Sequence, residues 1–191
     1  MKRPNWQTTA STYIVDSPFL RLRKDSVKLP DGTLIDDYFV REGRAYCVIF
    51  AVTPEKSIVL VRQFRYGIGR VVLELPSGII DENENPPECA LRELVEETGY
   101  VGQHIEHLTT LFVDPSNANT TMHLYLVRDA RPSAPQQLDA TEEIAVEVAT
   151  RKQLLDFVRD GTIEGVGQVA SVHFALDYLR QHETCSRSSG R

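Results

Sequence analysis

The segment from Gly78 to Tyr100, GIIDENENPPECALRELVEETGY, constrains what this chain can fold into more than any other stretch. It carries seven acidic side chains and a single basic one, so its net charge of −6 equals the formal charge of the whole protein. The rest of the chain is therefore close to neutral. Carboxylates crowded in this way repel one another, and the crowding indicates a site for a divalent cation.

The second half of this segment predicts a helix from Pro86 to Thr98. Proline is tolerated in the first turn of a helix, and Gly99 stands where a left-handed residue commonly ends one. At about 100° per residue, three carboxylates fall in one narrow arc: Glu93, Glu96 and Glu97. We expect the opposite side to face a core, and it consists of Leu91, Leu94, Val95 and Thr98.

This arrangement costs helix stability unless a cation binds. Like charges four residues apart destabilise a helix by roughly 0.2–0.5 kcal/mol per pair, and acids near its C-terminus oppose the helix dipole. Mg²⁺ is the natural candidate, because it accepts a few carboxylates while keeping water and phosphate oxygens around it. The alternative interpretation, from charge clustering alone, is an acidic helix face that is solvated.

The spacing is more specific than the charge. Gly78, then Glu84 six positions on, then the run Arg92-Glu93-Leu94-Val95-Glu96-Glu97-Thr98-Gly99-Tyr100 resembles the box of the Nudix family, with the aromatic Tyr100 a mild variant of the usual aliphatic residue. The resemblance implies an α+β fold, an α/β/α sandwich with a mixed sheet. It also implies hydrolysis of a diphosphate linked to another group. A catalytically inactive member of the family is the alternative.

The resemblance further implies roles for individual residues. Mg²⁺, with Mn²⁺ as the alternative ion, would be bound by Glu93, Glu96 and Glu97, with the backbone carbonyl of Ser77 adding an oxygen. Arg92 would orient a carboxylate of the box, either Glu96 or Glu84. The general base would come from Glu142 or Glu143, in an acidic loop after the box, or would be Glu96. The alternative for Glu142 and Glu143 is an ordinary exposed loop.

Outside the box, apolar runs and turn residues predict the order of the elements. A hairpin with a Pro30-Asp31-Gly32 turn joins extended runs at 19–29 and 33–41, and further strands are expected at 45–53, 57–64, 71–75, 105–113, 121–127 and 144–148. Helices are expected at 151–159 and 168–181. We therefore expect an N-terminal β extension at 1–43, a hydrolase domain at 44–183 and a disordered tail at 184–191.

Three features outside the box indicate the substrate. The run Val61 to Gly67, followed by Glu74-Leu75-Pro76-Ser77-Gly78, resembles the ADP-ribose and sugar-nucleotide pyrophosphatase branch of the family. There Arg65, Arg62 and Gln63 would bind substrate, Arg65 through its planar fork of donors. The alternative for both arginines is a surface charge on a strand.

Pro115 is the second feature, because a proline at about this distance from the box marks the ADP-ribose branch. Ser116 and Asn117 replace the two glycines of many bacterial members, and the run through His123 is closer to the animal ADP-sugar type. The identity of the sugar therefore stays open, and a plain turn that ends a strand is the alternative for Pro115.

The N-terminal extension is the third feature, and in this branch it implies a homodimer. Trp6, the single tryptophan, would either stack a nucleobase or anchor an interface or core.

The sequence also excludes some classes of function. Its apolar runs are too short to span a membrane, its N-terminus lacks the apolar core of a secretory signal, and no basic tract indicates nucleic-acid binding. Three cysteines without metal-site spacing fit reduced thiols in the cytoplasm. The leading expectation is Mg²⁺-dependent hydrolysis of ADP-ribose to AMP and ribose 5-phosphate. The alternatives are a Nudix hydrolase of another nucleoside diphosphate derivative and a non-catalytic ADP-ribose sensor.

Overall fold

The structure, a computed structural model, describes residues 5–188, with side-chain exposure through residue 182. By backbone proximity the chain divides into two compact units. The first comprises Met1–Ala45 with Leu111–Thr121, and the second comprises Tyr46–Thr110 with Met122–Arg191. The sequence suggests the division near residue 44 but not the return of the chain to the first unit at 111–121.

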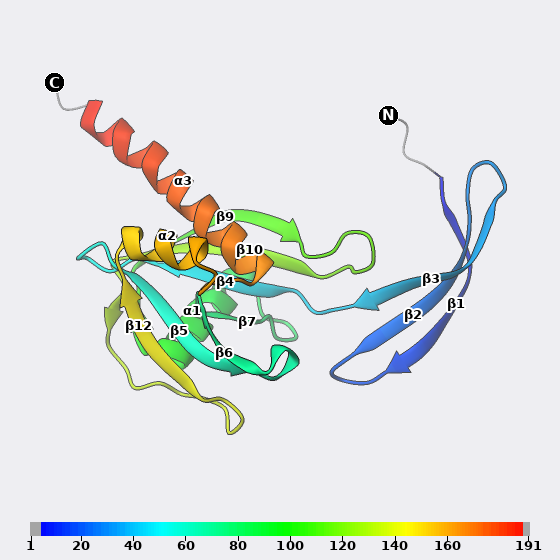
Figure 1. The fold of residues 1–191 in the computed structure, drawn as a ribbon, viewed down its shortest axis with the longest axis horizontal. Coiled ribbons are helices and arrows are strands. Elements are labelled where there is room, and N and C mark those ends of the chain that lie inside the picture. Colours follow the sequence, from blue (N-terminus) through cyan, green and yellow to red (C-terminus); the bar gives the residue numbers. More distant parts are fainter. Residues whose placement is uncertain (1–4, 189–191) are drawn as a thin grey trace. The chain divides into compact units, whose positions relative to one another are not determined.

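The first unit is built on a three-stranded antiparallel sheet in the order β1-β2-β3 (Figure 1). The strands are β1 (Gln7–Asp16), β2 (Arg21–Lys28) and β3 (Leu34–Glu42). The predicted hairpin is confirmed as β2 and β3. At its turn, the Leu29 N–H donates to the Thr33 carbonyl over 2.8 Å and Gly32 adopts φ +91°.

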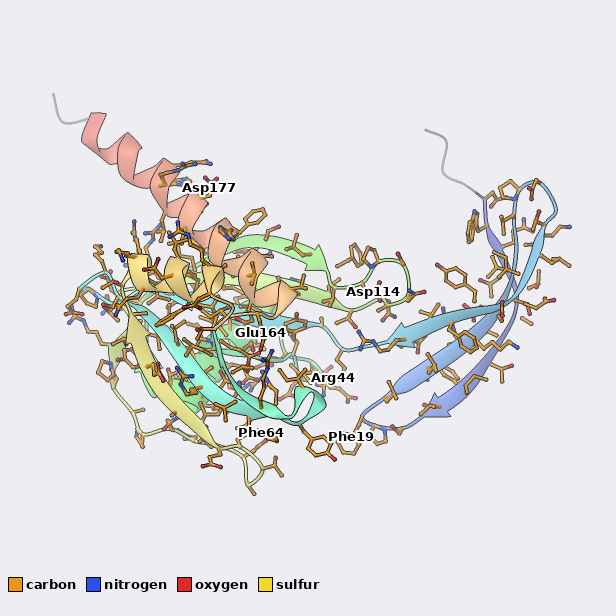
Figure 2. The ribbon with its side chains drawn as sticks, viewed as in Figure 1. Phe19, Arg44, Phe64, Asp114, Glu164 and Asp177 are labelled. Carbon is orange, nitrogen blue, oxygen red and sulfur yellow. The ribbon has the colours of Figure 1, made fainter. Side chains whose placement is uncertain are left out.

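Strand β1 is not expected from the sequence, which predicts only the two strands of the hairpin in this unit. Every residue of β1 is exposed, and its pairing with β2 is interrupted near Thr8 and near Tyr13. Without a buried face the strand has no regular apolar alternation, which is the pattern that identifies strands in a sequence. Phe19, in the connection from β1 to β2, is 98% exposed (Figure 2).

The segment 111–121 is attached to β3 within the first unit. The Arg41 N–H donates to the Asn117 carbonyl over 2.8 Å, and the Tyr38 hydroxyl donates to the Ser116 carbonyl over 2.6 Å. The side chain of Trp6 packs edge-to-face on Tyr38, with ring centroids 6.1 Å apart.

The second unit contains two larger sheets and a small one (Figure 1). The first has the order β7-β4-β10-β9, from β7 (Ser77–Ile79), β4 (Tyr46–Ala51), β10 (Thr121–Arg128) and β9 (His104–Phe112). The second has the order β12-β5-β6, from β12 (Ile144–Ala149), β5 (Ile58–Arg65) and β6 (Arg70–Glu74). The small sheet pairs β11 (Arg131–Pro132) with β8 (Tyr100–Val101). Strands β4 and β10 are parallel, and β4 and β7 are antiparallel, so the first sheet is mixed as expected.

The central strand β4 is buried on both faces, as its continuous apolar run predicts. On one side, Cys47, Ile49 and Ala51 share a cluster with residues of the acidic helix α1 (Pro86–Thr98). Because side chains alternate along a strand, the equally buried Val48 and Phe50 point to the other side.

The remaining helices are α2 (Arg151–Arg159), which packs on β12, and α3 (Val166–Ser188), which packs on β4 and α2. Helix α2 has the predicted bounds, and a capping box of Thr150 and Gln153 starts it. Helix α3 continues past the expected end at residue 181 to Ser188, so it includes part of the segment 184–191, of which 189–191 lie outside the described residues. Within the described part of the chain, no helix is long and apolar enough to cross a membrane.

Candidate active site

Helix α1 forms where the sequence predicts it. The Asn85 side chain accepts a hydrogen bond from the Glu88 N–H, Pro86 occupies the first turn, and Gly99 ends the helix at φ +70°. The buried face is rotated from the expected one. It consists of Cys89, Ala90, Leu94, Glu97 and Thr98, whereas Leu91 is 36% exposed. The core face therefore includes a carboxylate, which a purely apolar stripe would exclude.

Arg92 holds three of the carboxylates of this segment. Its guanidinium forks onto Glu84, with Nε 2.7 Å from Oε1 and Nη2 2.9 Å from Oε2. Its Nη1 lies 2.8 Å from Glu93 Oε1 and 2.8 Å from Glu96 Oε2. Both partners expected from the sequence, Glu96 and Glu84, are contacted. The hydrogen bonds from Arg92 lower the pKa of Glu84 to about 2, so this carboxylate is ionised at neutral pH.

Glu97 is buried, with 4% of its surface exposed, and its carboxylate accepts a hydrogen bond from an uncharged backbone donor. Its Oε2 accepts a hydrogen bond of 2.9 Å from the backbone N–H of Ser77, at the start of β7. Burial raises the pKa of Glu97 to about 8, with the charges of Glu93 and Glu142 adding to the effect. Burial also raises the pKa of Glu93, against the opposing effect of Arg92. Both carboxylates are therefore poorly compensated by the protein itself.

The glycine that opens the box has a steric reason. A Cβ on Gly78 would lie 1.8 Å from Cδ of Glu93 and 1.9 Å from its Oε1. The carboxylate of Glu93 thus rests directly on the backbone of β7. Ser77 and Gly78 together place the carboxylates of Glu97 and Glu93 at the same edge of the sheet.

This donor set fits a hard divalent cation. It supplies only oxygens and is partly buried, and the charges of neighbouring carboxylates raise the cost of ionising Glu93 and Glu97, which a cation would relieve. Within the described residues, no three acidic, histidine or cysteine side chains are already gathered around a common point. The residues that would bind the ion are instead held by Arg92 and by the Ser77 N–H.

A pocket of about 550 Å³ borders Ser77 and Gly78. Its wall includes Arg65 from the end of β5, and the Arg65 guanidinium contacts Glu74 Oε2 at 2.9 Å through Nε and 2.8 Å through Nη2. Gln63 donates to the same oxygen over 3.1 Å. Gln63 therefore supports the carboxylate that fixes Arg65.

Arg62 lies on the opposite face of the same strand. Its Nε is 2.5 Å from Oε1 of Glu147 on β12, and it is absent from the wall of the pocket. Side chains alternate along β5, so Arg62 and Arg65 cannot face the same side. We therefore leave Arg62 out of the candidate site, contrary to the expectation from the sequence.

The loop that carries Glu142 is fastened to the end of α1. Gln136 Nε2 donates to the Glu97 carbonyl over 2.6 Å and to the Ile144 carbonyl over 3.1 Å. Glu142 accepts a hydrogen bond of 3.0 Å from the Asp139 N–H, and its charge reaches both Glu93 and Glu97. Glu143 is exposed. Of the two candidate bases, Glu142 is the one that interacts with the carboxylate cluster.

Two of the candidate residues belong to the first unit. Trp6 is 46% exposed and rests on Tyr38, and Pro115 is exposed beside Ser116, whose carbonyl the same tyrosine contacts.

Sequence reasoning missed several residues that line the pocket. They are Tyr46, Tyr66, Ile68 and Gln168, and Glu74 was noted only as part of a motif. Glu74 pairs in register with Val61, on the strand that bears Gln63 and Arg65. Gln168 comes from a helix 90 positions after Gly78, and nothing local in the sequence indicates its position.

The chain is similar to proteins of known class over almost all of its length. Residues 42–164 match the NUDIX domain, and residues 6–40 match the nucleoside diphosphate sugar hydrolase N-terminal domain. The ADP-ribose pyrophosphatase of Bacillus subtilis (strain 168) is 30% identical over 184 residues, which span 96% of this chain and 97% of that protein. The methanol dehydrogenase activator of Bacillus methanolicus is 30% identical over 169 residues, 88% of this chain and 91% of the relative.

A solved structure shares the fold. The crystal structure of an ADP compounds hydrolase superposes with a TM-score of 0.82 at 18% identity, covering 95% of this chain and 97% of the other. The expected α+β sandwich of Nudix type is confirmed by this likeness.

Proposed function

The chain belongs to the Nudix hydrolase family, and from this premise we propose that it cleaves the diphosphate bond of ADP-ribose, releasing AMP and ribose 5-phosphate. One observation carries the proposal. The pocket that contains Arg65 is also lined by Ser77 and Gly78, and these two residues contact the carboxylates of Glu97 and Glu93. A phosphate group held by Arg65 would therefore lie beside a cation held by the box. The names of the relatives support ADP-ribose or a similar ADP-sugar as substrate.

The cation would be Mg²⁺, with Mn²⁺ as a substitute, bound by Glu93, Glu96 and Glu97 and the Ser77 carbonyl. When bound, it neutralises the diphosphate and stabilises charge on the attacking and leaving oxygens. Arg92 keeps Glu93 and Glu96 oriented from the side, since it already contacts both and Glu84.

Other residues of the chain bind the substrate and accept a proton. Arg65, fixed by Glu74, binds a phosphate or the terminal ribose through its fork of donors. Glu142 accepts the proton of the attacking water, and Glu143 and Glu96 are the alternative bases. Glu142 is preferred because its loop is fastened to α1 at Glu97 and its charge already acts on the cluster.

We also propose a homodimer formed through the first unit, with Trp6 and Pro115 at the interface or on the substrate. Every residue of β1 is exposed, including the large apolar side chains of Tyr13, Ile14 and Val15, and Phe39 on β3 is 43% exposed. A three-stranded sheet with so little buried surface gains stability when a second copy covers it. A cytoplasmic location is a further proposal, supported by the free thiols of Cys47 and Cys89.

The test is a chromatographic hydrolysis panel with and without Mg²⁺. It compares ADP-ribose, ADP-glucose, GDP-mannose, NADH, diadenosine polyphosphates and nucleoside triphosphates. The proposal expects Mg²⁺-dependent release of AMP, fastest from ADP-ribose. Pyrophosphate released from a triphosphate, or preference for a polyphosphate, would contradict the substrate while keeping the family. Tight ADP-ribose binding without turnover would identify a sensor instead.

A further inference from the structure

A buried amide of helix α3 lies in the wall of the candidate pocket. Gln168, in the first turn of α3, is 7% exposed. Its Oε1 accepts a hydrogen bond of 2.8 Å from the Leu75 N–H, and its Nε2 donates to the Leu75 carbonyl over 3.3 Å. One side chain thus satisfies both backbone groups of a residue that is itself fully buried. Unpaired, each of those groups would carry a large desolvation cost.

Leu75 stands in the short connection from β6 to β7, two residues before Ser77. Pro76 has no N–H to donate, and its carbonyl accepts a hydrogen bond of 2.8 Å from Ile49 on β4. The Ser77 N–H then donates to Glu97. The connection is therefore tied at three consecutive residues: to α3 at Leu75, to β4 at Pro76 and to the buried carboxylate at Ser77.

The start of α3 is itself firmly placed. A Cβ on Gly167 would lie 3.0 Å from Sδ of Met122 and 3.1 Å from the hydroxyl of Tyr46, so the helix backbone rests closely on β10 and β4. Just before the helix, Glu164, labelled in Figure 2, forms an ion pair with Arg70 of β6. A side chain projecting from so fixed a backbone can hold another segment in place.

We propose that Gln168 is a positioning residue for the cation site: through Leu75 it fixes the Ser77 backbone, and through Ser77 the carboxylate of Glu97. This inference rests on the proposed function, because it assigns Ser77 and Glu97 to cation binding. It requires no contact between Gln168 and the cation. Partners that hold a metal ligand in place typically change metal affinity or activity by about 10–100-fold when removed.

Gln168→Met tests this, because methionine keeps the length of the side chain and removes both hydrogen bonds. Ser171→Ala is the matched control. Ser171 lies one turn further along α3, is fully buried, and its hydroxyl donates to Met122 Sδ over 3.8 Å. Gln168→Glu is the conservative variant, since a carboxylate can still accept from the Leu75 N–H but cannot donate to the Leu75 carbonyl.

Two readouts need no turnover. The first is Mn²⁺ affinity, measured from the free-ion signal in electron paramagnetic resonance. The second is hydrogen exchange of the Ser77 amide in the metal-free protein, measured by NMR. We expect Gln168→Met to weaken Mn²⁺ binding and to speed Ser77 exchange, each by about tenfold or more, with Gln168→Glu intermediate and Ser171→Ala at the wild-type level.

Wild-type Mn²⁺ affinity and wild-type Ser77 exchange in folded Gln168→Met would overturn the inference. Equal losses in Gln168→Met and Ser171→Ala would also overturn it, because they would reflect loosening of α3 alone. If Gln168→Met does not fold, the same comparison is made with Gln168→Glu, where wild-type values count against the proposal. A protein that hydrolyses no nucleotide but shows these changes would refute the proposed substrate and keep the positioning role.

Discussion

Replacing Gly78 by alanine should separate activity from stability. The added Cβ would lie 1.8 Å from Cδ of Glu93, whereas carbon atoms in contact are about 3.5–4.0 Å apart. The carboxylate must therefore move by about 2 Å, since the backbone of β7 is paired with β4. A misplacement of about 1 Å at a catalytic group can cost about 100-fold in rate. We expect kcat/KM for ADP-ribose to fall by at least about 100-fold.

The fold should tolerate the same change. The clash involves the far end of a flexible side chain, and a strained rotamer of Glu93 costs about 1 kcal/mol. Gly78 does not have the positive φ that disfavours alanine. Replacing glycine with alanine at such a position stabilises the folded state by about 0.4–1 kcal/mol, because it reduces the conformational entropy of the unfolded chain. The free energy of unfolding, measured by denaturant titration, should therefore change by less than about 1 kcal/mol.

A double-mutant cycle with Glu93→Ala provides the decisive control. If the alanine at 78 acts by displacing Glu93, it should cost little more activity once that carboxylate has been removed. Steady-state rates of AMP release from ADP-ribose would be compared in the wild type, both single variants and the double variant. Wild-type activity in Gly78→Ala, or an undiminished penalty in the Glu93→Ala background, would refute the steric argument.

Three further predictions concern the pocket, the loop and the first unit. Arg65→Met should raise KM for ADP-ribose by roughly 10-fold or more. Arg62→Met alters the opposite face of the same strand and should leave KM within about twofold of the wild-type value. Equal changes of KM in the two variants, measured by steady-state kinetics, would contradict the assignment of Arg65 alone to the pocket. Gln136→Ala should release the loop from α1 and lower kcat by about tenfold with KM little changed, and unaltered hydrogen exchange across 133–143 would count against that loop's role. Burial raises the pKa of Asp25, but hydrogen bonds from Ser11 and Arg23 outweigh it and leave that pKa lowered. The stability this adds is present above the unfolded pKa of about 3.9 and is lost as pH falls below it, so the difference in unfolding free energy between wild type and Asp25→Asn should shrink on acidification; a constant difference from pH 7 to pH 3 would exclude the linkage.

The box and its helix could be predicted because their determinants are local. Proline at the start, glycine at the end and a fixed spacing of acids act within a few residues, and α1 has the predicted bounds. The orientation of that helix was predicted less well. Leu91 is exposed and Glu97 is buried, where its carboxylate accepts a hydrogen bond from the Ser77 N–H. Ser77 belongs to strand β7, and the periodicity of the helix carries no information about the position of that strand.

The missed features depend on partners distant in sequence. Strand β1 has no buried face to impose an alternation, so nothing distinguishes it from a polar coil. Gln168 reads as an ordinary helical residue until the fold brings it to Leu75. The positions of Arg62 and Arg65, by contrast, could have been predicted from the sequence. Their spacing of three along a strand already places them on opposite faces, and the expectation that both bind substrate set this aside.

We propose that the buried carboxylates of α1 bind the cation that drives hydrolysis. This proposal is tested most directly by the initial rate of AMP release from ADP-ribose across a Mg²⁺ titration, in wild type and in Glu97→Gln. Glutamine retains an oxygen to accept the Ser77 N–H, so the fold should persist. We expect turnover in the wild type to depend on Mg²⁺. In Glu97→Gln we expect loss of turnover and weakened Mg²⁺ binding, with unchanged thermal stability. Wild-type turnover and Mg²⁺ dependence in Glu97→Gln would contradict it.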